Sequence, residues 1–377
     1  MKYKHIFAML AAVCILFQTG CYPGDASPAD SSTSSSDSSA PSEAAAVRSD
    51  NEKLHIQITE EQITAANHSS AQTGVTGTVH PWDTDALQTL FGDEIESERR
   101  LSAQPVDARN YHIYDLHDGG ILNCSDGHIN YSKTKRTDTI YSVYFDDFVE
   151  YLTPSLLADR FPKPELEDFP VADAKETVQQ YIDALEIPVA GEPTILALDL
   201  DSITALREEA IAQTGDAEFY PAWTKEDEAY RFSYRLGTEE MPLLSYPLIG
   251  GDDKANYFDA YLSVIVSKSG VLFMDCKGAL DLDTSAASAQ TVCSADAALS
   301  AVKDNIERTV VTKETTLTNL YFGYAMKYVD DFHFELTPMY FVGSYAMSNT
   351  TLADGTRTAI PISSPHFISA ETGKELS

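Results

Sequence analysis

The stretch Tyr230-Arg-Phe-Ser-Tyr-Arg-Leu236 carries the clearest secondary-structure pattern in the chain. Large apolar or aromatic residues alternate strictly with polar residues along its whole length. Successive side chains of a β-strand point to opposite faces, so this pattern predicts a strand with one apolar face. Such a face needs a covering layer, and a helix packed on a sheet provides one.

A helix is predicted before this strand and a hairpin after it. Asp173-Ala-Lys-Glu176 has the spacing of a capped helix start. The apolar residues of the helix fall on one stripe: Ala174, Val178, Tyr181, Ile182 and Leu185. Strands are predicted at 258–266 and 271–274, joined by the turn Ser267-Lys-Ser-Gly270. Residues 168–285 are therefore expected to form a helix followed by an antiparallel meander.

The same order of elements recurs towards the end of the chain. Ser294 opens a predicted helix, and its apolar side holds Leu299, Val302 and Ile306. Strands are predicted at 317–328, 332–336 and 339–345. The turn Ala370-Glu-Thr-Gly373 matches the turn at 267–270. Residues 286–377 are expected to form a second module of the same plan, which makes the fold class α+β.

Residues 53–167 are predicted to form an N-terminal α+β region. Its elements are a strand at 54–58, a capping box at Thr59-Glu-Glu-Gln62, a helix at 84–91, and strands at 111–116, 121–131 and 139–144. Two glycine turns, Asp118-Gly119-Gly120 and Ser125-Asp126-Gly127, predict hairpins here.

The first twenty residues have the pattern of a secretory signal peptide. Lys2, Lys4 and His5 precede an apolar run of twelve residues from Ile6 to Phe17. A membrane-spanning helix needs roughly twenty apolar residues, so this run is too short to span a bilayer. It fits the core of a signal peptide, and residues 1–20 are expected to be removed on export.

Cys21 is the expected lipid anchor and first residue of the mature protein. It follows Gly20, and a small residue before a cysteine is what lipoprotein signal peptidase recognises. Gln18 stands where Leu is usual, so an ordinary signal peptide cut near Gly20 is the alternative. Residues 21–52 are rich in Ser, Ala, Asp and Pro and are predicted to be a flexible tether. Acyl chains such as palmitate would then hold the protein on the extracytoplasmic face of the membrane.

The charge of the chain restricts its partners. Without Lys2 and Lys4 the mature chain has 24 Lys and Arg against 58 Asp and Glu, a net charge of −34. A surface this acidic repels nucleic acid, so no nucleic-acid partner is expected. It also excludes electrostatic attachment to anionic lipid. The membrane is therefore expected to be reached only through the lipid on Cys21.

Three cysteines remain in the folded part: Cys124, Cys276 and Cys293. An odd number cannot form a complete set of disulfides. Cys276 and Cys293 could pair, but three buried thiols are the favoured interpretation.

Three histidines, His112, His117 and His128, are weak candidates for a metal site. They lie among Asp115, Asp118, Cys124 and Asp126, which are all residue types that bind Zn²⁺. The spacing argues against a site, because His112 and His117 would point to opposite faces of a strand. No metal site is therefore assigned, and no cofactor is expected.

No catalytic residue is assigned either. Asp199-Leu-Asp201 and Asp281-Leu-Asp283 lack the glycine of an EF-hand loop. Ser132-Lys-Thr-Lys135 has the serine–lysine spacing of penicillin-binding proteins, but no Lys-Thr-Gly follows it. Nucleophile-elbow, zinc-protease and phosphate-binding motifs are absent.

Three segments of the second module carry a family resemblance: LTNLYFGYAMKY at 317–328, ELTPMYFVG at 335–343 and ISAETGKE at 368–375. With its helix, this module resembles Firmicutes exported proteins with PepSY-like or YycI-like modules, and uncharacterised Firmicutes lipoproteins. The resemblance extends over 168–377 and implies two PepSY-like repeats. Tyr340 stands where these proteins commonly have Trp. The resemblance implies a non-enzymatic envelope protein that inhibits, regulates or binds a partner.

The leading hypothesis is a lipid-anchored extracytoplasmic protein that binds or modulates another envelope protein. An extracellular hydrolase acting on glycan or peptide is the first alternative, and it requires carboxylates that converge about 5–10 Å apart. A solute-binding lipoprotein is the second, and it requires two doubly wound lobes with parallel sheets.

Overall fold

A computed structural model describes residues 53–99, 109–134, 159–218, 220, 222–245, 257–308, 313–330 and 332–376. The chain divides into two units, residues 1–43 and 44–377, and every described residue belongs to the second unit. The expected signal peptide, Cys21, the whole tether and the predicted strand at 139–144 lie outside the described residues.

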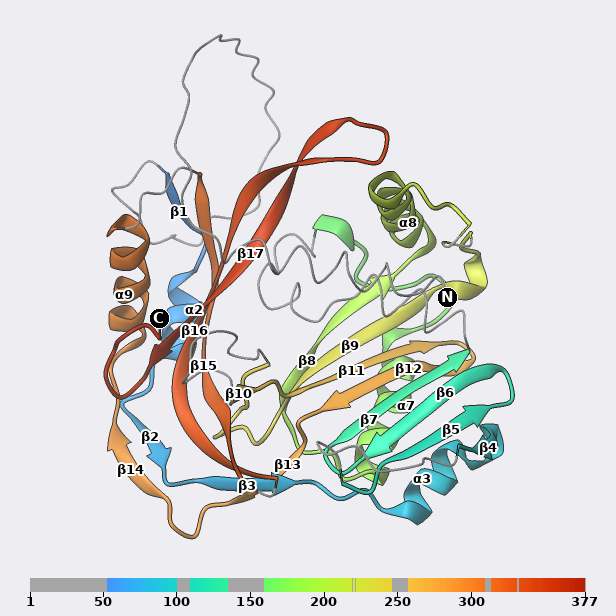
Figure 1. Cartoon of the computed structure of the whole chain (residues 1–377), viewed down its shortest axis with the longest axis horizontal. Coiled ribbons are helices and arrows are strands. Elements are labelled where there is room, and N and C mark those ends of the chain that lie inside the picture. The colour runs from blue at the N-terminus through green and yellow to red at the C-terminus, as the bar shows by residue number, and fades with distance from the viewer. Residues whose placement is uncertain are drawn as a thin grey trace. The chain divides into compact units, whose positions relative to one another are not determined.

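An eight-stranded antiparallel sheet forms one side of the described part (Figure 1). Its strands, in spatial order, are β4 (Ile95–Glu98), β5 (His112–Leu116), β6 (Gly119–Ser125), β7 (His128–Thr134), β12 (Gly270–Lys277), β11 (Tyr261–Ser267), β9 (Ala229–Leu236) and β8 (Val189–Leu198). The two glycine turns at 118–120 and 125–127 join β5, β6 and β7 as predicted. The sheet combines hairpins from 95–134 with strands from 189–277 through the pairing of β7 with β12.

A seven-stranded sheet forms the other side. Its main path is β1 (Leu54–Ile56), β15 (Thr315–Asp330), β16 (His333–Thr351), β3 (Thr76–Val79) and β13 (Leu280–Asp283). In addition, β10 (Tyr257–Phe258) pairs with β15 and β17 (Arg357–Ser369) pairs with β16. All pairs are antiparallel except that of β1 with β15, so the sheet is mixed. A separate small sheet joins β2 (Ser70–Thr73) to β14 (Ser288–Thr291).

Five α-helices occur among the described residues: α2 (Glu60–Ala66), α3 (Thr84–Phe91), α7 (Val171–Ala184), α8 (Leu200–Thr214) and α9 (Ala295–Arg308). Two short 3₁₀ helices, η1 (Gly92–Glu94) and η2 (Lys225–Asp227), accompany them. α7 packs on β9, β11 and β12, and α9 packs on β15, β16 and β17. The fold is therefore α+β, as predicted. In this part of the chain no helix has the length and apolarity that crossing a bilayer requires.

Local helix signals were correct in three cases and wrong in one. α9 begins at Ala295 directly after Ser294, whose hydroxyl accepts from the N–H of Ala297, as predicted. The capping box at α2 is present, with Thr59 and Gln62 each bonding the backbone of the other. α3 has its predicted bounds, and Asp83 caps it through two backbone N–H groups. α7 starts at Val171 after Pro170, without a side-chain cap, so the predicted start at Asp173 is wrong. Pro170 lies at the N-cap with an extended backbone, and Glu165 Oε1 accepts the N–H of Val171 over 3.2 Å, so the acceptor for the first turn comes from outside the predicted motif.

β9 is buried on both faces. Tyr230, Phe232 and Tyr234 lie in the main core, as the alternating pattern predicts. Arg231 and Ser233 of the polar face are buried as well. Arg231 donates from Nε to Ser263 Oγ over 3.1 Å, which places its charge in a polar layer across the sheet.

Two predicted strand boundaries differ from the structure. β16 runs unbroken through Pro338, where strands at 332–336 and 339–345 were expected. Pro338 lies opposite Tyr324, whose carbonyl oxygen accepts from the N–H of Leu244 and whose own N–H donates to Pro242 O. Both backbone groups of Tyr324 therefore point away from β16, and the pair needs no N–H from proline. The expected strand at 258–266 is split, because Phe258 pairs in the seven-stranded sheet and Tyr261–Ser267 pairs in the eight-stranded sheet. The chain thus crosses between the sheets at Asp259 and Ala260.

Candidate binding cleft

The structure does not bring the three candidate histidines together. His112 Nδ1 lies 2.7 Å from Glu98 Oε1, His117 lies in the turn between β5 and β6, and His128 Nε2 lies 3.6 Å from Asp275 Oδ1. Among the described residues, no three His, Cys, Asp or Glu side chains are arranged to hold a metal ion.

The remaining members of that polar cluster have other partners. Asp115 pairs with Arg99, and this hydrogen bond lowers the pKa of its carboxyl group. Cys124 is buried, which raises the pKa of its thiol to about 11. Cys276 is also buried and free, whereas Cys293 is free but only half-buried, so the expectation of three buried thiols is wrong for Cys293.

The serine of the Ser-x-x-Lys spacing is not exposed for nucleophilic attack. Ser132 is fully buried in β7, and its hydroxyl donates to the carbonyl oxygen of Thr134. The sequence indicated that Ser132 lies in a polar stretch after a strand. In the structure β7 continues through Thr134, so Ser132 is a residue of the strand itself. The lysine of that spacing, Lys135, lies outside the described residues, and its neighbour Lys133 has Nζ 3.4 Å from Glu94 Oε1.

Asp199 begins α8, a helix that the sequence analysis missed. Its carboxylate accepts from the backbone N–H groups of Asp201 and Ser202. Lys163 Nζ lies 3.0 Å from the same carboxylate. Burial opposes ionisation of Asp199, but the hydrogen bonds from Ser202 and Lys163 outweigh burial and lower its pKa. The Asp-Leu-Asp pattern at 199–201 is thus a helix cap.

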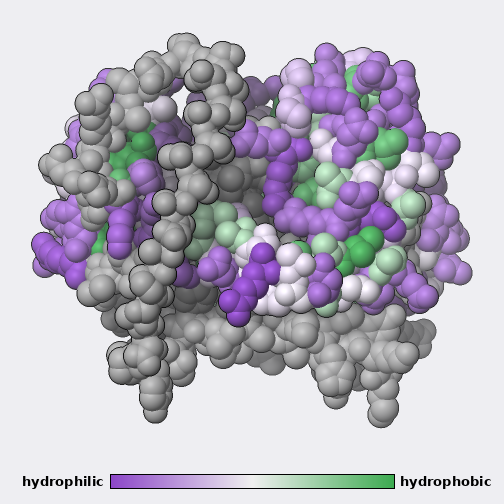
Figure 2. Space-filling model, turned by 90° about the horizontal axis from the view of Figure 1, so that it is seen from above, coloured by the Kyte–Doolittle hydropathy of each residue, from purple (hydrophilic) through white to green (hydrophobic). Residues whose placement is uncertain are grey.

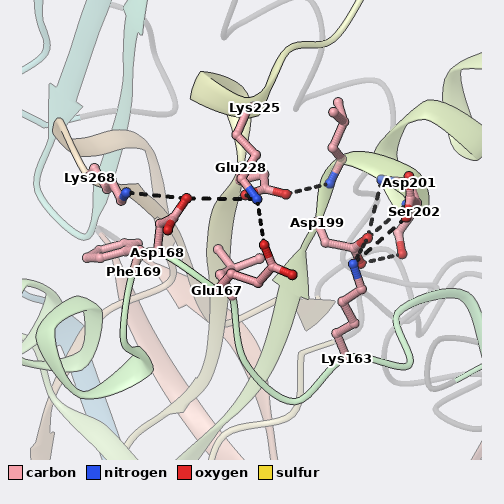
Figure 3. A network of polar contacts seen from close by, with 12 residues as sticks. Lys163, Glu167, Asp168, Phe169, Asp199, Asp201, Ser202, Lys225, Glu228 and Lys268 are labelled. Carbon is pink, nitrogen blue, oxygen red and sulfur yellow. Dashed lines mark hydrogen bonds and ion pairs between the residues drawn. The ribbon is translucent and has the colours of Figure 1, made fainter.

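A cavity of about 440 Å³ lies beside this helix start, with a network of ion pairs at its rim (Figure 3). Lys225 Nζ lies 3.2 Å from Glu167, 3.8 Å from Asp168 and 3.5 Å from Glu228. The hydrogen bond to Glu167 raises the pKa of Lys225. These pairs tie the segment before α7 to η2, which is a structural role.

A larger cavity of about 640 Å³, the inter-sheet cleft, lies where the two sheets meet. One wall belongs to the seven-stranded sheet and the other to the eight-stranded sheet and the segment after it. The first wall is formed by Phe258, Met326, Tyr328, Phe332 and Phe334. The second wall includes Ser125, Asp126, Gly127, His128, Lys277 and Gly278.

Three rings of the first wall form a cluster. The ring centroids of Phe258 and Phe334 are 5.6 Å apart, and Tyr328 lies 5.9 Å from each of them. Phe334 is buried, but Phe258 is 40 % exposed and Tyr328 is 37 % exposed. We call these three residues the aromatic cluster. It presents ring surface to the cleft and to solvent.

The polar groups at the cleft are mostly paired with one another. Lys277 Nζ lies 2.8 Å from Asp259, whose side chain is buried. Asp126 accepts from the side-chain amide of Asn110. The guanidinium of Arg109 lies 5.0 Å from the centroid of the Phe332 ring, a cation–π distance. The cleft therefore combines apolar rings with a balanced set of charges.

Several interactions hold the second wall in place. Trp82 donates from Nε1 to the carbonyl oxygens of Ser125 and His128, over 2.6 and 3.1 Å. The N–H of Gly127 donates to His80 O over 2.7 Å. Gly278 has φ +74°, and a β-carbon there would overlap Asp259 O, so only glycine fits at this corner. The cleft is thus a preformed cavity.

A β-bulge extends the apolar surface beyond the cleft. The pairing of β15 with β16 passes from Tyr328–Phe334 directly to Asp330–His333, so Val329 has no opposite residue. A bulge of this kind redirects side chains, and Val329 is 55 % exposed beside Tyr328. In the described part, the exposed large hydrophobic residues are Phe258, Tyr328, Val329 and Met347. Two of these four, Phe258 and Tyr328, line the inter-sheet cleft, and Val329 directly follows Tyr328 in the chain.

None of the aromatic residues of this cleft was identified as functional from the sequence, and His128 of the second wall was considered only as a weak metal candidate. In the sequence, Tyr328 and Phe258 belong to apolar strand patterns that indicate core positions. The only local signal was the dense aromatic stretch from Tyr328 to Phe334 around a tight turn. Their exposure depends on where the two sheets meet, which involves strands far apart in the sequence.

Comparisons with known proteins show a shared fold and no family. No protein-family model and no curated protein matches this sequence. The structure is similar to the 1.45 Å crystal structure of an uncharacterised protein from Eubacterium rectale ATCC 33656, a member of the Firmicutes. The TM-score is 0.59 at 15 % identity, and the match covers 87 % of this chain and 92 % of that chain. At this identity the likeness concerns the fold alone.

Proposed function

We propose that this chain is a lipid-anchored extracytoplasmic binding protein whose inter-sheet cleft receives its partner. One observation carries the proposal: of the four exposed large hydrophobic residues in the described part, Phe258 and Tyr328 line that cleft and Val329 is the next residue after Tyr328. Exposed apolar patches mark interaction sites, because their burial against a partner is favourable. Among the described residues visible in Figure 2, hydrophilic residues predominate, with hydrophobic residues interspersed between them.

The leader, Cys21 and the tether support the proposed location. Labelling of cells with a clickable fatty acid tests it, because Cys21→Ala removes the proposed acceptor thiol. We expect label on the native chain and none on the variant. Equal label on both chains would contradict a lipid anchor at Cys21.

Binding is favoured over hydrolysis by the state of the carboxyl groups. Those with a shifted pKa in the described part are all shifted downward: Asp115, Asp199, Asp275, Asp283 and Asp354. A general acid in glycoside hydrolysis needs a raised pKa. The solute-binding alternative needs lobes with parallel sheets, whereas the strands here pair almost entirely antiparallel.

The order of elements supports a role as a partner-binding or regulatory protein. α7 precedes the meander of β8, β9, β11 and β12, and α9 precedes the meander of β15, β16 and β17. Each helix packs on strands of its own meander. We take these as the two PepSY-like modules, with α8 inserted in the first module.

A photo-crosslinker tests the cleft as the binding site in living cells. Tyr328 is replaced by p-benzoylphenylalanine, and Met347 is replaced in the same way as the control. Met347 is 45 % exposed but lies outside the cleft. We expect a discrete adduct of higher mass from position 328 that is absent from position 347. The same adducts from both positions, or none from 328, would overturn the proposal.

A further inference from the structure

We infer that the occupant of the inter-sheet cleft is a polypeptide that inserts an aromatic or long aliphatic side chain against the aromatic cluster and places a carboxylate against Arg109. This inference rests on the proposed function and specifies its partner. It follows from three features: the extent of the apolar surface, the geometry of the rings and the pairing of the charges.

The extent of the apolar surface favours a polypeptide over a small molecule. A volume of about 640 Å³ is within the range of small-molecule sites, roughly 300–1,000 Å³. A small ligand would be enclosed by such a cavity. Here the apolar surface continues outward over Val329, which lies outside the cleft lining and is the most exposed large hydrophobic residue described. A cavity bordered by exposed apolar surface suits a partner that buries one anchoring side chain and covers the surroundings.

The rings determine which side chain fits. Phe258 and Phe334 meet nearly edge to face, with an interplanar angle of 85°, and Tyr328 is inclined by 73° to Phe334. The rings already touch one another, so they leave a ridged apolar surface and no gap that would surround a cation. Flat or flexible apolar groups pack best on such a surface. Met326 beneath them is fully buried and closes the floor.

The charges determine what accompanies that side chain. Asp259 already pairs with Lys277, and Asp126 already accepts from Asn110. The Arg109 side chain is exposed, and its guanidinium lies over the Phe332 ring. It forms no ion pair with a described carboxylate. The distant acidic surface matters little here, because charges are screened over about 8–10 Å at physiological salt. The local complement is therefore an acidic group on the partner, next to its apolar anchor.

A displayed library of random twelve-residue peptides tests this inference on the full chain purified in detergent. We expect enriched peptides to carry Phe, Tyr, Trp, Leu or Met close to Asp or Glu. A synthetic peptide of the enriched sequence should bind Tyr328→Ser at least tenfold more weakly than it binds the native chain. Tyr328→Phe keeps the ring and should bind within about twofold. Met347→Ser, which changes an exposed residue outside the cleft, should bind as the native chain does.

Reversal of charge isolates the role of Arg109. Arg109→Glu should weaken binding of the acidic peptide at least tenfold and should enrich peptides with Lys or Arg in place of Asp or Glu. Unchanged melting temperatures of the variants show that the fold is intact. Enriched peptides without acidic residues, or binding that is equal on Tyr328→Ser and the native chain, would overturn the inference. An adduct at position 328 in cells without any enriched peptide would leave the proposed function standing and exclude a polypeptide as its occupant.

Discussion

Gly343 of β16 lies opposite Asn319, next to the bulge of β15 between Leu317 and Asn319. A β-carbon at position 343 would overlap Asn319 Oδ1 and come within 3.1 Å of Thr318 Oγ1. Asn319 and Thr318 are both buried, so neither side chain has room to withdraw. The glycine is required here because of close approach and not because of its φ angle.

Gly343→Ala should therefore destabilise the protein by about 1–3 kcal/mol, the usual cost of overpacking a filled interior. Chemical denaturation measures this loss. The double variant with Asn319→Ala removes the group that the new methyl would strike. Its loss should be smaller than the sum of the two single losses. Strict additivity would contradict the steric explanation.

Asp199→Asn should cost about 1 kcal/mol of unfolding free energy at pH 7, because asparagine still caps α8 but lacks the negative charge that interacts with Lys163 and with the helix dipole. The folded-state pKa of Asp199 lies below its ordinary value of 3.8. The stabilisation is therefore full above that ordinary value and is lost as the pH falls through the lowered folded pKa. Stability curves of the two chains should converge below about pH 4. Asp201→Asn, whose side chain is almost fully exposed, is the control and should leave stability nearly unchanged at every pH.

At the scale of elements, β17 is an exposed edge that resists pairing with other chains. β17 pairs with β16 along its whole length, and from Arg357 to His366 no other described strand pairs with it. Pro361 and Pro365 are four positions apart, so both lack an N–H on the same outward side of the strand. Proline on an edge prevents another strand from adding to the sheet.

Pro361→Thr combined with Pro365→Thr should expose a continuous edge and promote self-association. Analytical ultracentrifugation at increasing concentration checks for dimers and larger species. Ser364→Thr is the control, because the backbone of this residue faces β16. A double variant that remains as monomeric as the control would show that the prolines do not protect this edge.

Elements with strong local signals were predicted well, and the partners of strands were not. α3, the stripe of α9 and the hairpins of β5, β6 and β7 follow from capping, periodicity and glycine turns within a few residues. α8 was missed because its apolar residues do not form a continuous stripe, and little of it beyond Ile203 is buried. The pairings of β1 with β15 and of β7 with β12 join distant segments, and no local pattern specifies them.

The candidate site was unpredictable for the same reason. The polar cluster around His112 and His128 was considered as a metal site because its residue types can bind metal ions. In the structure the two histidines have different partners, Glu98 and Asp275. In the sequence, Phe258 and Tyr328 look like ordinary strand residues. Their exposure results from the pairing of β10 with β15 and from the bulge that interrupts the pairing of β15 with β16. Exposure at such a junction is a tertiary property.

For the whole molecule, segment 241–245 links the two sheets. Leu243 donates its N–H to Leu236 of β9, while Tyr324 of β15 donates its N–H to Pro242. Gly323 permits this approach, since a β-carbon there would lie 2.8 Å from Pro242 O. The two sheets also share one continuous core. The described part should therefore behave as one cooperative unit.

Urea unfolding should accordingly give one transition, with the same midpoint by far-ultraviolet circular dichroism and by fluorescence of Trp82 and Trp223. Both tryptophans contact the eight-stranded sheet or the cavity beside it, whereas circular dichroism reports both sheets. Gly323→Ala should lower the shared midpoint without separating the two probes. Two midpoints in the native chain would show that the sheets unfold independently.

The parallel pair of β1 and β15 has a consequence for how the protein is made. Synthesis runs from the amino end, so Leu54–Ile56 emerges long before its partner Thr315–Leu317. The first partner of β3, β13, is synthesised only at residues 280–283, and its second partner, β16, follows at 333–335. Chain closure over such separations is slow, since its entropy is lost before any contact repays it. The first strands of the folded unit must therefore remain unpaired, and open to chaperones or proteases, until most of the chain has been synthesised.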